Sequence, residues 1–194
     1  MKLWHKIALS IVLGIPLMAF AAYWAYEISD MHAQREQYAV YSAYLSQSLQ
    51  TNYHDFGDGR GLLVILDHSV PATTDGRGAV PGASSGMRRD LVLHNLTTIH
   101  FEARFSLPTE YKLISSYKLL EGTGDPVELS PEERRRTLGG FITLSRISFN
   151  RTGTLALFYT EHLACGLCGG GDLVLMQKQN GQWKMIDDYS SWVS

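Results

Sequence analysis

An uncharged run of 20 residues, 7–26, is the feature that most constrains what this chain can fold into. As a helix rising ~1.5 Å per residue it would span ~30 Å, which is the hydrocarbon thickness of a bilayer. Lys2 and Lys6 precede the run, and Glu27 and Asp30 follow it. This charge bias predicts a single-pass anchor with a cytoplasmic N-terminus and an extracytoplasmic remainder.

A cleaved signal peptide is the alternative interpretation of the same segment. Residues 7–18 form an acceptable apolar region, Pro16 is a plausible breaker, and Ala19-Phe20-Ala21 matches an A-x-A cleavage site. Cleavage after Ala21 would make the domain a secreted protein. Both alternatives place residues 27–194 outside the cytoplasm, where disulfide bonds form and persist.

Residues 27–194 have the length of a single domain, since domains commonly contain ~100–150 residues. The chain is 45% hydrophobic and 11% aromatic, which allows a packed core. Beyond Lys2 and Lys6, 15 of the 17 basic residues remain against 19 acidic residues. This mildly acidic balance argues against a nucleic-acid partner, whose binding would need a basic face.

Helical periodicity and turn residues predict how this domain begins. Apolar and aromatic side chains spaced three to four apart predict an amphipathic helix over residues 27–50. The apolar run 62–66 predicts a buried strand, and residues 72–90, rich in Gly, Ser, Thr and Pro, predict a flexible loop. A second helix is predicted from apolar residues spread over 92–103.

A third, short helix is predicted to start at Ser130. Ser130 is a suitable N-cap, Pro131 suits the first helical position, and two acids follow. Arg134–Arg136 then complement the dipole at the C-terminal end and pair with the acids, which we favour over a phosphate site.

The last third of the chain predicts four strands in succession, at 141–149, 154–161, 172–178 and 182–193. Residues 150–153 form a predicted hairpin loop, and Asn180-Gly181 is a strong two-residue hairpin signal. Such short connections require antiparallel neighbours. A long helix followed by this meander predicts an α+β fold with a roll-like, cystatin-like shape.

The segment 162–171 contains both cysteines of the chain, Cys165 and Cys168, and connects two predicted strands. A structural disulfide is one interpretation, because the compartment is oxidising and the number of cysteines is even. A redox-active C-x-x-C pair is the second, although the pair is not at the start of a helix. A metal site formed by His162, Cys165 and Cys168 is the third, although no fourth ligand is evident.

Other side chains near this segment are weaker candidates for ligand binding. The glycines at 169–171 could offer backbone N–H groups to an anion, and Tyr159, His162 and one of the acids Asp187 and Asp188 could meet at one end of the sheet. The candidate ligand-binding set is Tyr159, Gly169, Gly170 and Asp187. No signature of a catalytic nucleophile with its base is present, so a non-enzymatic role without a cofactor is favoured.

The C-terminal stretch resembles a family of uncharacterised bacterial exported or membrane-anchored proteins. The resemblance rests on motifs found in the same order along the chain, including Leu144-Ser145-Arg146, Phe149-Asn150, Cys165-Gly166-Leu167-Cys168-Gly169, Asn180-Gly181-Gln182-Trp183-Lys184 and the terminal Trp192-Val193-Ser194. It implies a bacterial inner-membrane location and a shared shape, but no mechanism. The resemblance also implies that some members space the two cysteines by one more residue than this chain does, as Cys-Gly-x-x-Cys-Gly. That spacing favours a bridge over a C-x-x-C redox pair.

These observations predict an envelope protein whose domain is a non-enzymatic binding or structural module on the extracytoplasmic side of the membrane. Its expected partners are the membrane, through residues 7–26, and an unknown small ligand or envelope protein. The alternative is a periplasmic thiol-redox or metal-dependent enzyme centred on Cys165 and Cys168.

Overall fold

The computed structural model of the chain describes residues 31–51, 61–72, 80–116, 118, 126–138, 140–165 and 168–193. The chain divides into two compact units, Met1–Tyr38 and Ala39–Ser194. Of the first unit, only the helical residues 31–38 are described. Among the described residues, no helix has the length and apolar character needed to cross a membrane. The predicted anchor at 7–26 lies outside the described residues.

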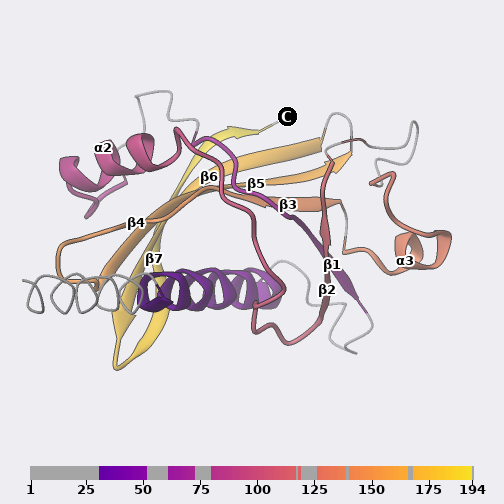
Figure 1. The fold of residues 1–194 in the computed structure, drawn as a ribbon, viewed down its shortest axis with the longest axis horizontal. Coiled ribbons are helices and arrows are strands. Elements are labelled where there is room, and N and C mark those ends of the chain that lie inside the picture. Colours follow the sequence, from indigo (N-terminus) through magenta and orange to yellow (C-terminus); the bar gives the residue numbers. More distant parts are fainter. Residues whose placement is uncertain are drawn as a thin grey trace, which may run out of the picture. The chain divides into compact units, whose positions relative to one another are not determined.

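The second unit is built on a seven-stranded mixed sheet with the order β2-β1-β3-β5-β6-β7, in which β4 pairs with β5 (Figure 1). The strands are β1 (Leu62–Leu66), β2 (Glu110–Ile114), β3 (Phe141–Leu144), β4 (Ser148–Phe149), β5 (Leu155–Cys165), β6 (Cys168–Gln179) and β7 (Gln182–Val193). Strand β1 runs parallel to β2 and β3, and all other pairs are antiparallel. The predicted α+β class, with a helix before a C-terminal antiparallel meander, is confirmed.

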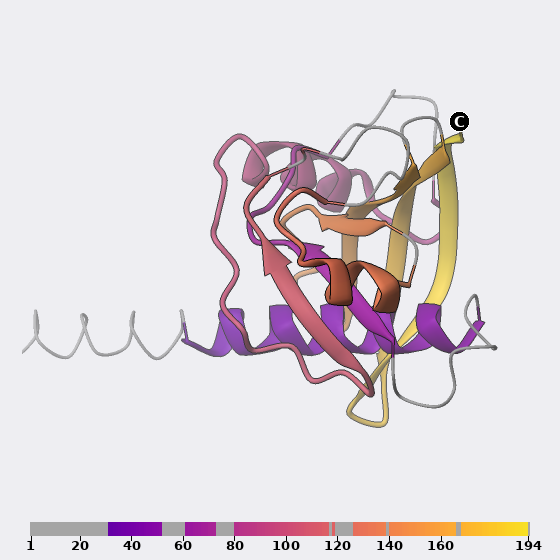
Figure 2. The same ribbon diagram turned by 90° about the vertical axis from the view of Figure 1, so that its right-hand side faces the viewer.

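The helical residues 39–51 cover one side of this sheet, which we call the helix face (Figure 2). Phe158, Thr160 and His162 of β5 alternate along this face. The rings of Tyr41 and Tyr44 contact the Phe158 ring at centroid distances of 5.5 and 5.2 Å, in edge-to-face geometry. The helix predicted over 27–50 is confirmed for the part that the structure describes.

Tyr41 is the main anchor of this helix on the sheet. Its side chain is fully buried, and its ring also lies 5.6 Å from that of Phe101 and 6.2 Å from that of Phe105. The Tyr41 hydroxyl donates a 2.6 Å hydrogen bond to the backbone oxygen of Ser145. Tyr41 therefore buries its ring while its polar tip remains satisfied, as a buried tyrosine requires.

The opposite side of the sheet, which we call the α2 face, carries a second apolar layer. Helix α2 (Ser85–His94) contributes the buried side chains Met87 and Leu91 to it. The sheet contributes alternate residues that include Leu157, Tyr159, Leu173 and Leu175, all buried in the same cluster. Both faces of the central strands are thus covered, which explains the continuous apolar sequence of β1.

Helix α2 corrects two predictions, because it begins inside the predicted 72–90 loop and ends well before residue 103. Ser84 starts the helix, and its side chain accepts a hydrogen bond from the Met87 N–H. Asn95 ends it: the Asn95 side chain donates to the backbone oxygens of Leu91 and Arg146 and accepts from the Arg146 N–H. A contact 51 residues away in sequence therefore sets the helix end.

The strand predicted over 141–149 is also corrected, because it is divided into β3 and β4. At Ser145 the side-chain oxygen accepts a 2.7 Å hydrogen bond from the Tyr159 N–H. A side chain thus replaces a backbone group in the ladder, and the Ser145 backbone oxygen is left to accept from Tyr41. The regular pairing with β5 resumes at Ser148.

Turn and cap signals in the sequence correctly predicted the Asn180-Gly181 turn and the start of the third helix. Asn180 and Gly181 have φ values of 52° and 81° and join β6 to β7, as their positive-φ preference predicts. Ser130 and Glu133 form a reciprocal capping box at the start of helix α3 (Pro131–Arg136). Arg136 pairs with Glu110, in agreement with a structural rather than a phosphate-binding role for this cluster.

Candidate functional site

The segment around the cysteines is a hairpin and not the predicted 162–171 loop. Strand β5 runs to Cys165, and β6 starts at Cys168, so these two residues are register partners at the end of the hairpin. Cα atoms of directly opposed residues lie ~4.5–5.5 Å apart, which is within the ~4.4–6.8 Å range of disulfides. The backbone is thus suited to a bridge. The side chain of Cys165 lies outside the described part of the chain, so the disulfide stays a prediction.

The glycine run of β6 makes room for an aromatic side chain on the α2 face. Gly171 is the register partner of Trp192, and a Cβ atom at Gly171 would overlap both the Trp192 Nε1 atom and the Tyr159 hydroxyl. Trp192 Nε1 donates to the Tyr159 hydroxyl over 2.7 Å, and that hydroxyl donates to Glu161 over 2.9 Å. The glycines belong to an extended strand, so their amides take part in the sheet instead of forming an anion nest.

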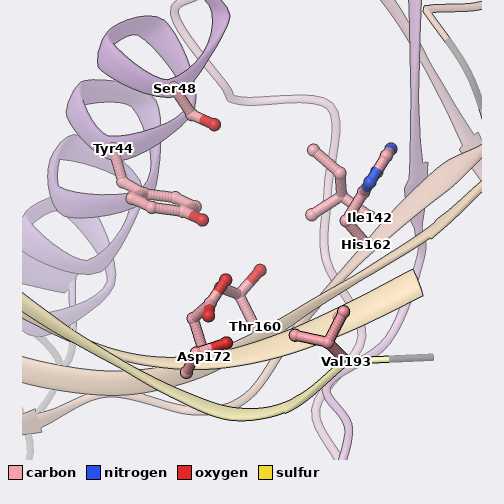
Figure 3. A pocket seen from close by; sticks show the side chains of 9 residues that line it. Tyr44, Ser48, Ile142, Thr160, His162, Asp172 and Val193 are labelled. Atoms are coloured by element: carbon pink, nitrogen blue, oxygen red, sulfur yellow. The ribbon is translucent and has the colours of Figure 1, made fainter. Parts of the chain in front are cut away.

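A cavity of about 240 Å³ lies on the helix face, between residues of the 39–51 helix and the sheet (Figure 3). In this view Tyr44 and Ser48 project from the helix, and Thr160 and Asp172 project toward them from the sheet. The cavity is lined by Tyr44, Ser48, Ile142, Thr160, His162, Gly170, Asp172, Ser190 and Val193. Six of these nine residues have polar side chains, although the same face is apolar nearby at Phe158 and Val174.

Strand register explains why these residues meet. Thr160 is opposite Asp172, and Asp172 is opposite Ser190, so one row of polar side chains crosses β5, β6 and β7. His162 and Gly170 are opposite each other in the next row on the same face. Tyr44 and Ser48 are four residues apart, which places both on one side of the helix.

The surroundings of the cavity perturb two of its ionisable groups. The pKa of Tyr44 is raised from 10.0 to about 12, first by burial and then by the negative charge of Asp172, while hydrogen bonds with Thr160 and Ser48 act against the rise. Burial also raises the pKa of Asp172, helped by the charge of Asp188 and opposed by a hydrogen bond with Ser190 and by His162. Ionisable groups whose pKa values are shifted by burial and by nearby charges inside a cavity are typical of functional sites, so this cavity is the candidate site.

The sequence candidates are divided between the two faces. His162 and Gly170 line the cavity. Tyr159 is fully buried on the α2 face, and Asp187, the register partner of Leu175, lies on that same face. Asp187 and Tyr159 therefore do not meet His162, because neighbouring strand positions point to opposite sides of the sheet. Gly169 also lies on the α2 face, next to Trp192.

A metal centre receives no support from the described residues. Among them, no three or more His, Cys, Asp or Glu side chains are arranged to hold a metal ion. The proposed ligand set of His162, Cys165 and Cys168 includes one side chain outside that description, so this interpretation stays a prediction.

The cavity residues that sequence reasoning missed are Tyr44, Ser48, Ile142, Thr160, Asp172, Ser190 and Val193. A period-two signal was present, because Thr160 and His162 alternate in β5 and Gly170 and Asp172 alternate in β6. This signal identifies a site only when the register of β5, β6 and β7 is known, because the register shows which polar residues lie side by side.

Comparison of the chain with protein-family models, with curated proteins and with solved structures gives no match. The resemblance of the C-terminal stretch to exported bacterial proteins therefore stays a prediction, and the candidate site rests on its own geometry.

Substitution of Gly171 tests the packing of Trp192. Gly171→Ala is expected to destabilise the domain by ~1–3 kcal/mol, because the added methyl group overlaps Trp192 and Tyr159. Gly170→Ala is the matched control, since its nearest contact would be an ordinary 3.4 Å from the Trp192 backbone oxygen. Chemical denaturation, followed by tryptophan fluorescence, measures the free energy of unfolding of both variants. Equal losses of stability in the two variants would contradict this packing.

Substitution of Asp172 tests its burial. Because its pKa in the folded state is raised, the unfolded chain binds fewer protons than the folded chain at pH values between the ordinary and the raised pKa. The ionised carboxylate therefore lowers stability as the pH rises. We expect Asp172→Asn to melt at a higher temperature than the unchanged protein at pH 7, with the difference shrinking as the pH falls toward 3.8.

For a chain of this size, a shift of ~2–4 °C corresponds to ~1 kcal/mol. Asp187→Asn makes the same change of charge on the α2 face and serves as the control. A variant at Asp172 that melts at or below the temperature of the unchanged protein at pH 7 contradicts the burial of this carboxylate.

Proposed function

We propose that this protein is an envelope protein whose domain binds a small molecule on the extracytoplasmic side of a bacterial membrane, without catalysing a reaction. The observation that carries the proposal is the cavity of about 240 Å³ under the helix, lined by hydroxyl groups, His162 and Asp172. Ligand sites are typically concave and mostly preformed, with a few converging polar groups.

The polar side chains that line the cavity reduce the stability of the fold, and this loss of stability supports a binding role. A carboxylate, an imidazole and several hydroxyl groups occupy positions where this face elsewhere carries Leu144, Phe158 and Val174, all buried. Apolar residues at the same positions would fill the cavity and stabilise the fold. Residues that reduce stability in a cavity are typical of sites retained for function.

The apolar N-terminal run and the two cysteines are also consistent with a binding role outside the cytoplasm. The uncharged run 7–26 supports delivery across the membrane. In that compartment, a Cys165–Cys168 disulfide would fix the end of the β5–β6 hairpin, whose adjoining residues His162 and Gly170 line the cavity. We also propose, for the helix with β5, β6 and β7, the roll-like and cystatin-like arrangement expected from the sequence.

The second candidate is a periplasmic thiol-redox or metal-dependent enzyme centred on the same two cysteines, and their direct opposition across the hairpin is the observation in its favour. Such an enzyme would need an easily reduced pair or a bound metal ion. A structural bridge would be oxidised and difficult to reduce.

Blocking the cavity tests the binding proposal. The full-length chain is screened for binding of small soluble molecules by ligand-observed NMR, and Ser48→Leu is expected to weaken any hit at least about tenfold because its side chain extends into the cavity. Gln50→Leu, an exposed position on the same helix, is the control and should bind normally. Hits that bind equally to both variants, or no hits at all, contradict the proposal.

Differential alkylation distinguishes the two candidate functions. With the protein isolated from the envelope, we expect no alkylation of Cys165 or Cys168 before strong reduction, two alkylated cysteines after it, and no bound metal. Mass spectrometry and a metal assay provide the measurements. Alkylation without reductant, or one metal ion per chain, would favour the enzyme.

A further inference from the structure

We propose that the ligand of this cavity is a small organic cation, an ammonium compound whose charged end lies against Asp172. This inference rests on the proposed binding function and adds the chemical class of the ligand.

The charges around the cavity favour a cation. Asp172 lines it, and the carboxylate of Asp188 lies close enough to act on Asp172 electrostatically. None of the nine lining residues is a lysine or an arginine, and His162 is the one basic side chain among them. An anionic ligand would contact the Asp172 carboxylate, with the negative charge of Asp188 nearby and a single imidazole to balance both.

The hydrogen-bonding groups of the cavity also suit an ammonium group. Such a group has three N–H donors and no acceptor, so it requires several oxygen acceptors. Asp172 offers two carboxylate oxygens, and Tyr44, Ser48 and Thr160 offer hydroxyl oxygens from the helix and from the sheet (Figure 3). Ser190, the register partner of Asp172, offers a further hydroxyl oxygen. Tyr44, with a pKa of about 12, keeps its proton at neutral pH and adds no further negative charge.

Desolvation of Asp172 gives the cation a source of binding energy. Burial disfavours the ionised form of the Asp172 carboxylate. A bound cation would stabilise that ionised form and so offset the free-energy cost of desolvating it. Hydrogen bonds between charged partners contribute more than those between neutral groups, by about the amount that corresponds to a tenfold change in affinity.

The size of the cavity limits the ligand and argues against a metal ion. At ~30 Å³ for each water-sized group, about 240 Å³ accommodates about eight non-hydrogen atoms. A calcium ion would take ~6–8 oxygen ligands, whereas only one carboxylate lines the cavity and no metal-binding group is found in the described residues. A single-ring ammonium compound fits these limits.

The test compares benzylammonium, benzyl alcohol and benzoate, which are similar in size and differ in charge. Binding to the full-length chain in detergent is measured by calorimetry at pH 7, with detergent alone as the blank. Asp172→Asn removes the lining carboxylate, and Asp187→Asn makes the same change of charge on the α2 face. Ser48→Leu reports whether any binding occurs in the cavity.

We expect benzylammonium to bind at least about tenfold more tightly than benzyl alcohol. This preference should disappear in Asp172→Asn, persist in Asp187→Asn, and all binding should weaken in Ser48→Leu. Equal binding of the three probes, or tighter binding of benzoate, with continued sensitivity to Ser48→Leu, overturns the cationic class but leaves the binding function intact. Binding that is insensitive to Ser48→Leu, or no binding by any probe, overturns both.

Discussion

The hydrogen bond from the buried Tyr41 hydroxyl to the backbone oxygen of Ser145 is the contact on which the arrangement of the second unit depends. It spans 104 residues of sequence and is buried among the rings of Phe101, Phe105 and Phe158. Ser145 provides this acceptor because its own side chain interrupts the β3 ladder. One local break in a strand therefore positions the helix.

The same anchor explains where the cavity lies. Val40, Tyr41 and Leu45 are fully buried and hold the helix close to the sheet. Tyr44 and Ser48 lie on the adjoining side of the helix, above a row of small and polar side chains on β5, β6 and β7. The helix packs closely on the sheet at Val40, Tyr41 and Leu45. Beside these contacts, the small and polar side chains of the sheet leave an open space, which is the cavity.

The two faces of the sheet have different roles as a result. On the α2 face, large side chains fill the space. The Trp192 indole fills the space next to Gly169 and Gly171 on this face. On the helix face, Gly170 and the short side chains of Thr160 and Ser190 preserve the cavity. In strand β6, Gly171 thus allows Trp192 to pack on the α2 face, whereas Gly170 leaves the cavity open on the helix face.

Local signals predicted the parts of the fold that local interactions determine. The Asn180-Gly181 turn, the Ser130 N-cap and the apolar strand β1 each depend on a few adjacent residues, and all three are confirmed. The end of α2 at Asn95, the break at Ser145 and the pairing of β2 with β1 depend on partners far away in sequence. For the same reason, His162 and Gly170 were identified as candidates, whereas Asp172 and Tyr44 required the register.

The most direct test of a cation-binding cavity is a backbone-amide chemical-shift titration of the full-length chain with benzylammonium. We expect saturable shifts that centre on Thr160, Asp172 and Ser190 in the sheet and on Tyr44 and Ser48 in the helix. Shifts confined to the α2 face, around Tyr159 and Trp192, or no saturable shift at all, would contradict it.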